Sequence, residues 1–372
     1  IDNSSNNILI SGIIIDFNWV HFSNALFPII STEEITTEEL TTEEETTTEV
    51  DEENWNGSGH KAPKLEMNLT SSMIAEKEAL NGTVKQLERL AEKEQYVANE
   101  AIFLATSESY AEKVAEGYGA TLDSFEEGVA VMSFEDDVTE IIAMAEDMDV
   151  KLPAVYPNYL YETCDDEVTL IDLESLENTV DGISKDYYID YQTHHADIKT
   201  ANAWAYNDKA GKGIKVAVID SGVYKNHVEL KGKTTALNTY ATPWSGAEDN
   251  DGHGTHVSGI IAAKKDNNQG GAGVAYNASI ISIKALESNP ITGDCGGDTA
   301  SIIKAVNTAV SKGARVINMS LSGNYYDALY EETINKAVNK GVVVVVAAGN
   351  DKKQLSTSKT STNYYSPACF EN

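Results

Sequence analysis

Four apolar, β-rich runs in the second half of the chain constrain its fold more than any other feature of the sequence. Helical patterns alternate with these runs, and strands that are apolar along their whole length are typically buried on both faces. Regular alternation of such strands with helices is typical of a parallel sheet. The runs are KVAVID (215–220), SIISIKAL (279–286), RVINMSL (315–321) and VVVVVAA (342–348). The sequence therefore predicts an α/β fold, with a parallel sheet and helices on both of its faces.

The composition indicates a globular but strongly acidic protein. The chain has 372 residues, of which 41% are hydrophobic, so it is long enough for two or three domains. The 59 acidic and 27 basic residues leave a net charge of −32, which argues against a nucleic-acid partner because phosphates require a basic surface. Three cysteines are too few for a disulfide framework or a zinc ribbon. We find no clean apolar run of 18 residues and predict no transmembrane anchor.

The first 95 residues divide into two segments of different composition. Residues 1–60 contain an apolar stretch, 8–15, which is either the remnant of an export signal or an apolar segment without an assigned role. The same segment contains a Thr/Glu-rich spacer, 31–53, which repels itself and is expected to be disordered. Residues 61–95 are predicted to be a helical linker.

The middle of the chain predicts a small separate unit. Residues 96–161 follow the pattern strand–helix–strand–helix–strand, which is typical of an α+β unit of the split βαβ type. The unit contains no histidine, so we expect it to act as a folding aid, an inhibitor or a binding module. An acidic connector, 162–186, leads from it to the sheet-forming region, 187–372.

Polar residues with catalytic potential follow three of the predicted strands. In open parallel sheets the carboxyl ends of the strands form the binding edge. Asp220 ends the first run, His253 begins a helix between glycines, and Asn350 follows the last run. A helix amino end discourages protonation of an imidazole, and a carboxylate can orient that imidazole as a general base. The amide of Asn350 could donate to an oxyanion.

Three motifs in this order resemble those of subtilisin-like serine proteases, the subtilase family (peptidase family S8). They are VAVIDSGV (216–223), HGTHVSG (253–259) and VVVVVAAGN (342–350). The resemblance implies that Asp220 orients the imidazole, that His253 is the general base and that Asn350 binds the oxyanion. It covers about residues 187–372, and residues 96–161 are similar to the family's amino-terminal propeptide.

The resemblance also implies a substrate-binding cleft. The segment INMSLSG (317–323) resembles the family's substrate-binding strand. Its residues Ser320, Leu321, Ser322 and Gly323 would bind the substrate backbone, and Ala347, Ala348 and Gly349 would form the opposite wall of the specificity pocket. The family usually has Gly where Ser322 stands, so this pocket departs from the common shape.

The family's nucleophile lies in a Gly-Thr-Ser-Met-Ala-type motif, which this sequence lacks. The serines after Asn350 lie in polar, loop-like sequence without a following helix; they are Ser356, Ser358, Ser361 and Ser366. We therefore expect a zymogen truncated before its catalytic serine, inactive as it stands. The resemblance implies a secreted or cell-surface endopeptidase with protein or peptide substrates. It further implies that 96–161 is an intramolecular inhibitor, released by a cut within 162–186.

No cofactor is required by the resemblance, but it suggests a structural calcium ion. The loop 264–276 resembles the family's calcium-binding loop, with Asn267 at a ligand position and Glu229 where the family often has Asp. Oxygen ligands of this kind suit calcium. A solvated Gly/Asn turn is the alternative interpretation of the same loop.

Two further function classes remain open. A divalent-metal hydrolase could use Asp251, His253 and His256, with Asp249 nearby, although no second ligand cluster appears downstream. An inactive pseudo-protease or inhibitory binding protein is the other alternative. Retention of Asp220, His253 and Asn350 together argues against a pure binding role, which would not need all three.

Overall fold

The computed structural model describes most of the chain from residue 95 onward. The described residues are 5–10 and 13–18, for their backbone only, and 95–135, 137–138, 141–142, 152–164, 183–237, 246–288 and 295–371. The predicted Thr/Glu-rich spacer, almost all of the helical linker and most of the acidic connector lie outside the described residues.

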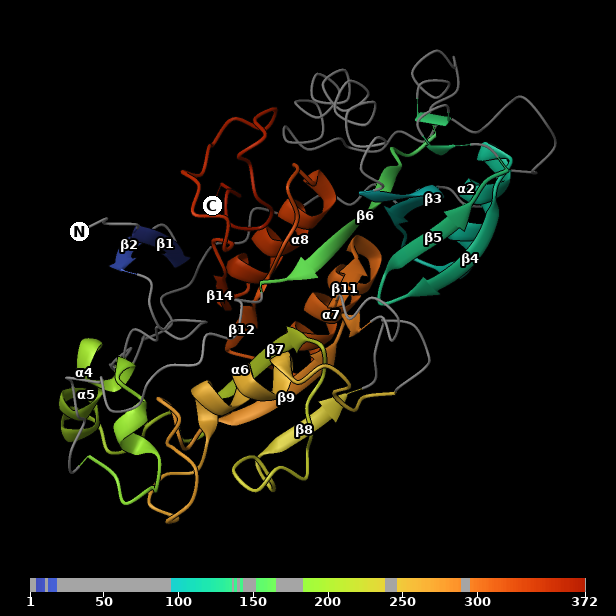
Figure 1. Ribbon diagram of the computed structural model, residues 1–372. Coiled ribbons are helices and arrows are strands. Elements are labelled where there is room, and N and C mark those ends of the chain that lie inside the picture. Colours follow the sequence, from blue (N-terminus) through green and yellow to red (C-terminus); the bar gives the residue numbers. More distant parts are fainter. Residues whose placement is uncertain are drawn as a thin grey trace, which may run out of the picture.

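A seven-stranded sheet forms the centre of the molecule (Figure 1), in the order β2-β1-β14-β12-β7-β9-β8. Its last five strands are parallel, which confirms the predicted α/β fold. They are β7 (Lys215–Asp220), β8 (Thr234–Leu237), β9 (Ser279–Lys284), β12 (Val316–Met319) and β14 (Val343–Val346). An antiparallel hairpin of β1 (Ser5–Ile10) and β2 (Ile13–Asn18) extends the sheet beside β14. These two strands include most of the apolar stretch 8–15 and were not predicted.

Helices cover both faces of this sheet, as predicted, because alternate residues of each strand point to opposite sides. On one face Val216 and Val218 of β7 pack against Val257 and Ile261 of α6 (His253–Ala262). On the other face Ala217 and Ile219 belong to the core formed with α7 (Thr299–Ser311) and α8 (Ala328–Asn339). The main core thus lies on the α7–α8 side.

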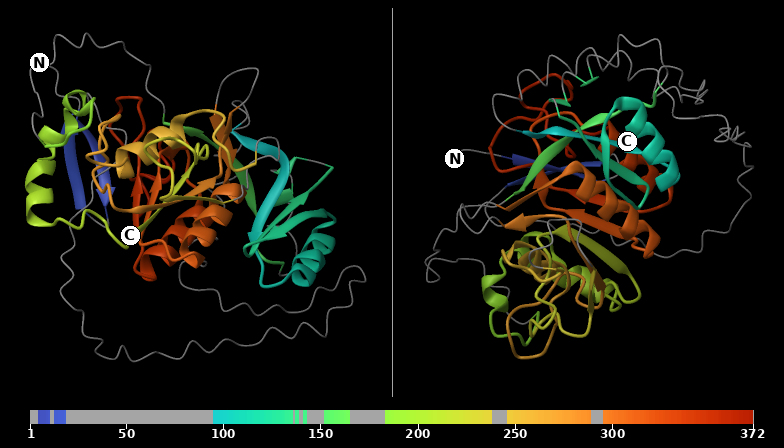
Figure 2. Two further views of the ribbon diagram at one scale, coloured as in Figure 1. Left: turned by 90° about the horizontal axis from the view of Figure 1, so that it is seen from below. Right: turned by 90° about the vertical axis from the view of Figure 1, so that its right-hand side faces the viewer.

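The described elements between residues 96 and 163 form an antiparallel unit at the opposite side of the molecule from the β1–β2 hairpin (Figure 2). Its elements are β3 (Tyr96–Leu104), α2 (Glu108–Tyr118), β4 (Thr121–Glu126), β5 (Val129–Ser133) and β6 (Tyr156–Thr163). Ser107 caps the start of α2, and Gly119, with φ of 71°, ends it in the left-handed conformation that glycine favours. Strand β4 was not predicted, because it is partly exposed and polar. Of the second predicted helix only residues 137, 138, 141 and 142 are described.

Strand β6 joins this unit to the rest of the molecule. One part of it pairs with β3, and its end pairs antiparallel with β11 (Cys295–Asp298) and β13 (Leu321–Ser322). Strand β11 also pairs with β10 (Glu287–Ser288). The end of β6 is therefore an extra strand inserted between two segments of the larger part.

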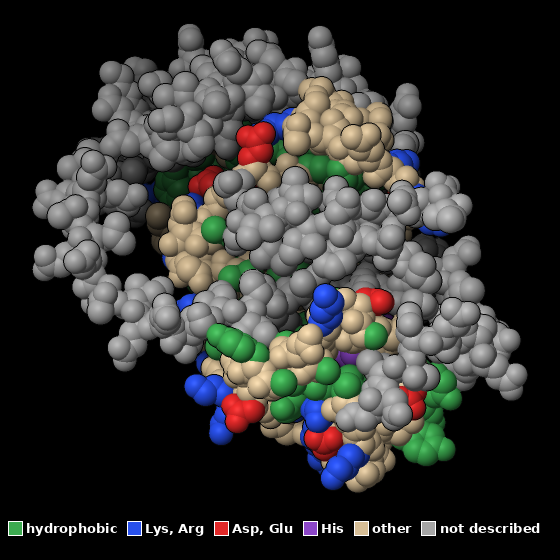
Figure 3. Space-filling model, turned by 90° about the vertical axis from the view of Figure 1, so that its left-hand side faces the viewer, with side chains coloured by type: hydrophobic (Ala, Val, Ile, Leu, Met, Phe, Trp, Pro, Cys, Tyr) green, Lys and Arg blue, Asp and Glu red, His purple; other side chains and the backbone are tan. Residues whose placement is uncertain are grey.

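The segment before β7 consists of short helices. They are a 3₁₀ turn (Ile189–Tyr191), α4 (His194–Asp197) and α5 (Thr200–Tyr206). Lys199, with φ of 57°, separates α4 from α5. Figure 3 looks onto this side of the molecule and shows hydrophobic and charged side chains interspersed on it. Among the described helices none is long and apolar enough to cross a membrane. All three cysteines are buried, and none of them forms a disulfide bond.

Candidate active site

Asp220 stands at the carboxyl end of β7 and is completely buried. Its carbonyl accepts the N–H groups of Ala285 and Leu286, which fixes the strand end beside the segment that follows β9. Its carboxylate oxygen Oδ1 accepts from the backbone N–H of Ser221 over 2.7 Å and from Nδ1 of His253 over 2.8 Å. The carboxylate therefore selects the tautomer and the ring orientation of His253.

His253 is the first residue of α6, and close packing fixes the helix start. Gly252 precedes it with φ of 112°, a conformation that a side chain would strain. A Cβ on Gly254 would overlap the carbonyl oxygen of Gly222, so only glycine allows this approach. The N–H of Gly254 donates to Oγ of Ser221 over 2.9 Å. These contacts bring the imidazole to Asp220 from a residue 33 positions away in sequence.

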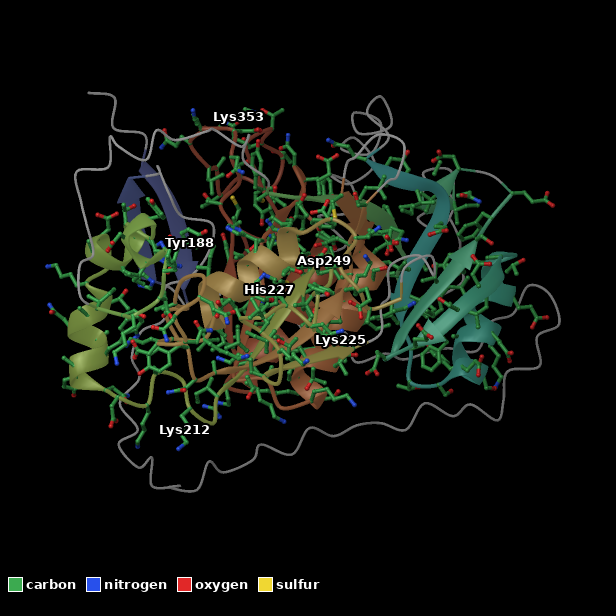
Figure 4. The ribbon with its side chains drawn as sticks, turned by 60° about the horizontal axis from the view of Figure 1, so that its bottom comes forward. Tyr188, Lys212, Lys225, His227, Asp249 and Lys353 are labelled. Carbon is green, nitrogen blue, oxygen red and sulfur yellow. The ribbon has the colours of Figure 1, made fainter. Side chains whose placement is uncertain are left out.

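Asp249 organises the loop that leads into α6 (Figure 4). Its Oδ1 accepts from Oγ of Ser221 and from the N–H of Gly252, and its Oδ2 accepts from the N–H of Thr255. Burial acts to raise the pKa of Asp249, but hydrogen bonds from Thr255, Gly252 and Asp251 outweigh it and hold the pKa below its usual value. The sequence had assigned Asp249 only to the metal alternative and missed this role.

The arrangement does not favour the metal-hydrolase alternative. His253 is engaged by Asp220, and both oxygens of Asp249 accept from N–H and hydroxyl donors. His256 is exposed on α6, and the N–H of His253 is bonded to Asp251 Oδ1. Within the described ranges no group of three or more His, Cys, Asp or Glu side chains could hold a metal ion.

Asn350 and the two predicted cleft walls meet beyond β14 and β12. The side-chain amide of Asn350 is buried, and neither its oxygen nor its nitrogen has a hydrogen-bond partner among the described residues. A Cβ on Gly349 would lie 3.9 Å from Oγ of Ser322, so the walls 347–349 and 320–322 face each other. A buried amide without partners costs free energy, which a ligand that accepts from it would recover.

The end of β6 pairs with the predicted wall 320–322. Leu321 pairs with Thr163 and Ser322 with Glu162, and the N–H of Cys164 donates to the carbonyl of Ser320 over 3.0 Å. The thiol of Cys164 lies 3.4 Å from Oγ of Ser322. This is the backbone pairing by which an added peptide strand binds a sheet edge. Gly323 does not take part in it; it pairs with Ser366 instead.

Hydrogen bonds engage several of the serines that follow Asn350. Ser366 is buried, and its hydroxyl donates to the carbonyl of Tyr325 over 2.5 Å. Oγ of Ser356 accepts from the N–H of Ser358 within their own loop. Oγ of Ser361 accepts from the N–H of Asn363.

The predicted calcium loop, 264–276, packs around Glu229. This carboxylate is 4% exposed; its Oε2 accepts from the amide of Asn267 over 2.8 Å, and its Oε1 is buried without a partner in the described part of the chain. Asp186 accepts the N–H groups of Asp266 and Asn267, a role that the sequence did not reveal. Glu229 also lines a pocket of about 600 Å³ together with His227 and Asp249, which are labelled in Figure 4.

The larger part of the molecule combines a parallel α/β sheet, an Asp–His pair at its carboxyl edge and an adjoining edge strand, β13, that pairs with β6. This combination is typical of the subtilisin-like class. Residues 211–372 match the model of the subtilase family, and this part of the chain belongs to that family. The family resemblance predicted from the sequence is thus confirmed.

Known relatives agree with this assignment. Over 186 residues, half of this chain, it is 34% identical to thermitase of Thermoactinomyces vulgaris and 37% identical to a thermophilic serine proteinase of Bacillus sp. (strain AK1). These matches cover 61% and 43% of the relatives' lengths, so the chain spans only part of them. The structure of fervidolysin from Fervidobacterium pennivorans, a keratinolytic enzyme related to subtilisin, superposes with a TM-score of 0.58 at 23% identity. That match covers 73% of this chain and 41% of fervidolysin, and supports the fold alone.

Proposed function

We propose that the full-length protein is a serine endopeptidase that uses Asp220 and His253 as two members of a catalytic triad. The observation that carries the proposal is the 2.8 Å contact between Nδ1 of His253 and the buried carboxylate of Asp220. In the proposed mechanism a serine hydroxyl attacks the peptide carbonyl while Nε2 of His253 takes its proton. His253 then returns that proton to the leaving amine, and water releases the acyl group. No motif for this serine occurs among the 372 residues.

The buried amide of Asn350 supports this mechanism. It lies at the end of the cleft wall 347–349 and has no hydrogen-bond partner among the described residues. A tetrahedral oxyanion would accept from this amide, so the donor would gain its partner as negative charge develops. The free-energy gain would therefore fall on the transition state rather than on bound substrate.

His253→Ala in the full-length protein tests the proposal. We expect loss of both peptide hydrolysis and self-cleavage, because the general base is removed. His256→Ala is a matched control from the same helix, exposed and three residues further on, and should keep peptide hydrolysis. Retained hydrolysis in the His253 variant would rule out the assigned base. Loss in the His256 variant, together with sensitivity to chelators, would instead favour the metal alternative.

We propose further that the unit from β3 to β6 is an intramolecular inhibitor and that the protein is an exported zymogen. The pairing of Glu162 and Thr163 with β13 supports this, since a peptide substrate would use the same edge. Among the described residues the N–H of Cys164 donates to the carbonyl of Ser320, next to β13, and we propose that self-cleavage falls directly after this contact, between Cys164 and Asp165.

Amino-terminal sequencing of the processed protein, recovered from the culture medium, tests this cleavage. Asp165 should be the first residue of the initial product. An amino terminus before Tyr161 would contradict the boundary, and processing in the His253→Ala variant would contradict cleavage by the protein's own active site.

A structural calcium ion at the loop 264–276 is also part of the proposal. The unpartnered Oε1 of Glu229 and the side chain of Asn267 would supply oxygen ligands, with loop carbonyls completing the set. At a free calcium concentration 100 times the dissociation constant, binding stabilises the fold by about 2.7 kcal/mol. Calcium should therefore raise the melting temperature of the native protein by several degrees, and Glu229→Gln should abolish that rise. Asp266→Asn, which changes an exposed carboxylate of the same loop, should preserve it.

A further inference from the structure

Tyr161, in the part of β6 that enters the cleft, fills a pocket lined by aromatic rings. Its side chain is 1% exposed, and its backbone pairs with Gly297 of β11. The ring meets Tyr325 edge-on, with centroids 5.3 Å apart, and Tyr330 of α8 in the same way at 5.5 Å. Figure 1 shows this end of β6 beside α7 and α8. The pocket thus belongs to the larger part of the molecule, and its occupant comes from the unit that we propose to be released.

A buried carboxylate lies at the inner end of this pocket. Asp327 is 1% exposed, and its Oδ1 accepts from the N–H of Tyr330 over 3.0 Å, which caps the start of α8. Its second oxygen, Oδ2, accepts from the hydroxyl of Thr299 over 2.6 Å and from the phenol of Tyr161 over 3.1 Å. Helix capping requires only one of the two oxygens, so Oδ2 is available to the occupant of the pocket.

The charge states of both groups favour this hydrogen bond at neutral pH. Burial raises the pKa of Asp327 to about 6, although hydrogen bonds from Thr299, Tyr330 and Tyr161 act to lower it. The carboxylate is therefore ionised near pH 7 and can only accept. Burial, followed by the nearby charge of Asp327, raises the pKa of Tyr161 well above its usual value, so the phenol keeps its proton and donates. A hydrogen bond to a charged acceptor is stronger than one between neutral groups.

We propose that Asp327 is a specificity-determining residue, which makes the mature enzyme prefer protein substrates with tyrosine as the fourth residue before the scissile bond. This inference rests on the proposed function, because Tyr161 stands fourth before the proposed cut and marks the place of a substrate side chain. Phenylalanine would make the same ring contacts but would leave Oδ2 with one donor fewer. A site built to bind a hydroxyl discriminates against the analogue that lacks it, because a buried polar group loses its partner.

The native, self-processed enzyme and two peptides test this inference. The peptides carry the sequences Tyr-Glu-Thr-Cys-Asp and Phe-Glu-Thr-Cys-Asp between a fluorophore and a quencher. We expect kcat/KM for the tyrosine peptide to exceed that for the phenylalanine peptide by roughly 10- to 100-fold. Equal values would overturn the inference. Failure to cleave either peptide in a His253-dependent manner would contradict the proposed function instead, so the two failures are distinguishable.

Two variants assign the preference to Asp327 itself. Asp327→Ser keeps a good helix cap but its short side chain does not reach the phenol, so the preference for tyrosine should fall to within about threefold. The readout is the ratio of kcat/KM for the two peptides, measured with the same preparation of the variant, because a general change in catalysis affects both peptides alike and leaves this ratio unchanged. Thr299→Val removes the other donor to Oδ2 and should increase the preference for tyrosine. An unchanged preference in both variants would overturn the inference, and the wild-type comparison decides it alone if Asp327→Ser does not fold.

Discussion

Asp220 accepts two hydrogen bonds with the same carboxylate oxygen, one from its neighbour Ser221 and one from His253. Asn at this position has nearly the same shape but carries no charge, so it can neither select the tautomer of His253 nor stabilise the imidazolium. We predict that Asp220→Asn lowers kcat by about 10⁴-fold, while the melting temperature changes little. Steady-state kinetics and thermal unfolding of the same preparation check this. A loss of less than tenfold would mean that the pair does not act as proposed.

For Asn350 we predict that a substitution lowers activity without lowering stability. Asn350→Ala should cost about 3–4 kcal/mol of transition-state stabilisation, seen as a lower kcat with KM little changed. The variant also removes a buried amide that has no partner among the described residues, so the melting temperature should stay constant or rise. A raised KM with unchanged kcat would assign Asn350 to substrate binding instead.

The site residues that could be predicted from the sequence are those that act within one continuous motif. Asp220 ends an apolar strand and His253 begins a helix between glycines, and both patterns are local. Asp249 acts through Ser221, 28 positions earlier, and Asp186 acts through a loop about 80 positions later. No local pattern encodes such pairs, because folding alone brings the two partners together.

At the scale of elements, helix α6 contains two glycines in contrasting surroundings. A Cβ on Gly254 would overlap the carbonyl of Gly222 and approach Asp220, whereas a Cβ on Gly259 would meet nothing within 4 Å. Gly254→Ala should destabilise the fold by about 1–3 kcal/mol and displace His253. Gly259→Ala should stabilise it by up to about 1 kcal/mol, because alanine is the better helix former. Thermal unfolding of both variants checks this, and equal shifts would show that the helix start is not tightly packed.

The elements also differ in how far the sequence predicts them. β7, β12 and β14 contain continuous apolar runs, so their burial between helix layers is visible in the sequence. Strand β11 has the sequence CGGD, which carries no strand pattern. It forms because its glycines admit close neighbours: a Cβ on Gly296 would lie 2.8 Å from the carbonyl oxygen of Tyr161. Tertiary contact, rather than local preference, makes this segment a strand.

At the scale of the whole molecule, β6 gives the two parts a shared sheet. Its beginning completes the small unit through β3, and its end pairs with both β11 and β13. A cut after Cys164 would leave these hydrogen bonds in place, so cleavage and release are separate steps in the proposed activation. The inhibitor would then leave only when the strand pairing and the buried contacts of Tyr161 are lost together.

The stability of the whole molecule should depend on pH through His195. Its side chain is 1% exposed, its Nε2 donates to the carbonyl of Ala272 over 3.0 Å, and its ring lies 5.3 Å from that of Trp204. Burial lowers the pKa of His195 from 6.5 to about 4, although the hydrogen bond to Ala272 acts to raise it. Between these values the unfolded state binds a proton that the folded state does not, so stability falls as the pH falls.

The size of this effect is roughly 3 kcal/mol between pH 6.5 and pH 4, because each pKa unit corresponds to 1.36 kcal/mol. Asp327 acts in the opposite sense, since its pKa is raised from 3.8 to about 6 and its protonation favours the folded state as the pH falls. A single stability curve therefore mixes both effects. His195→Gln isolates the first, because glutamine can still donate to Ala272 but does not titrate. At constant calcium concentration, the free energy of unfolding of the native protein should fall relative to this variant only below pH 6.5. Parallel curves for the two proteins would show that His195 does not carry the pH dependence.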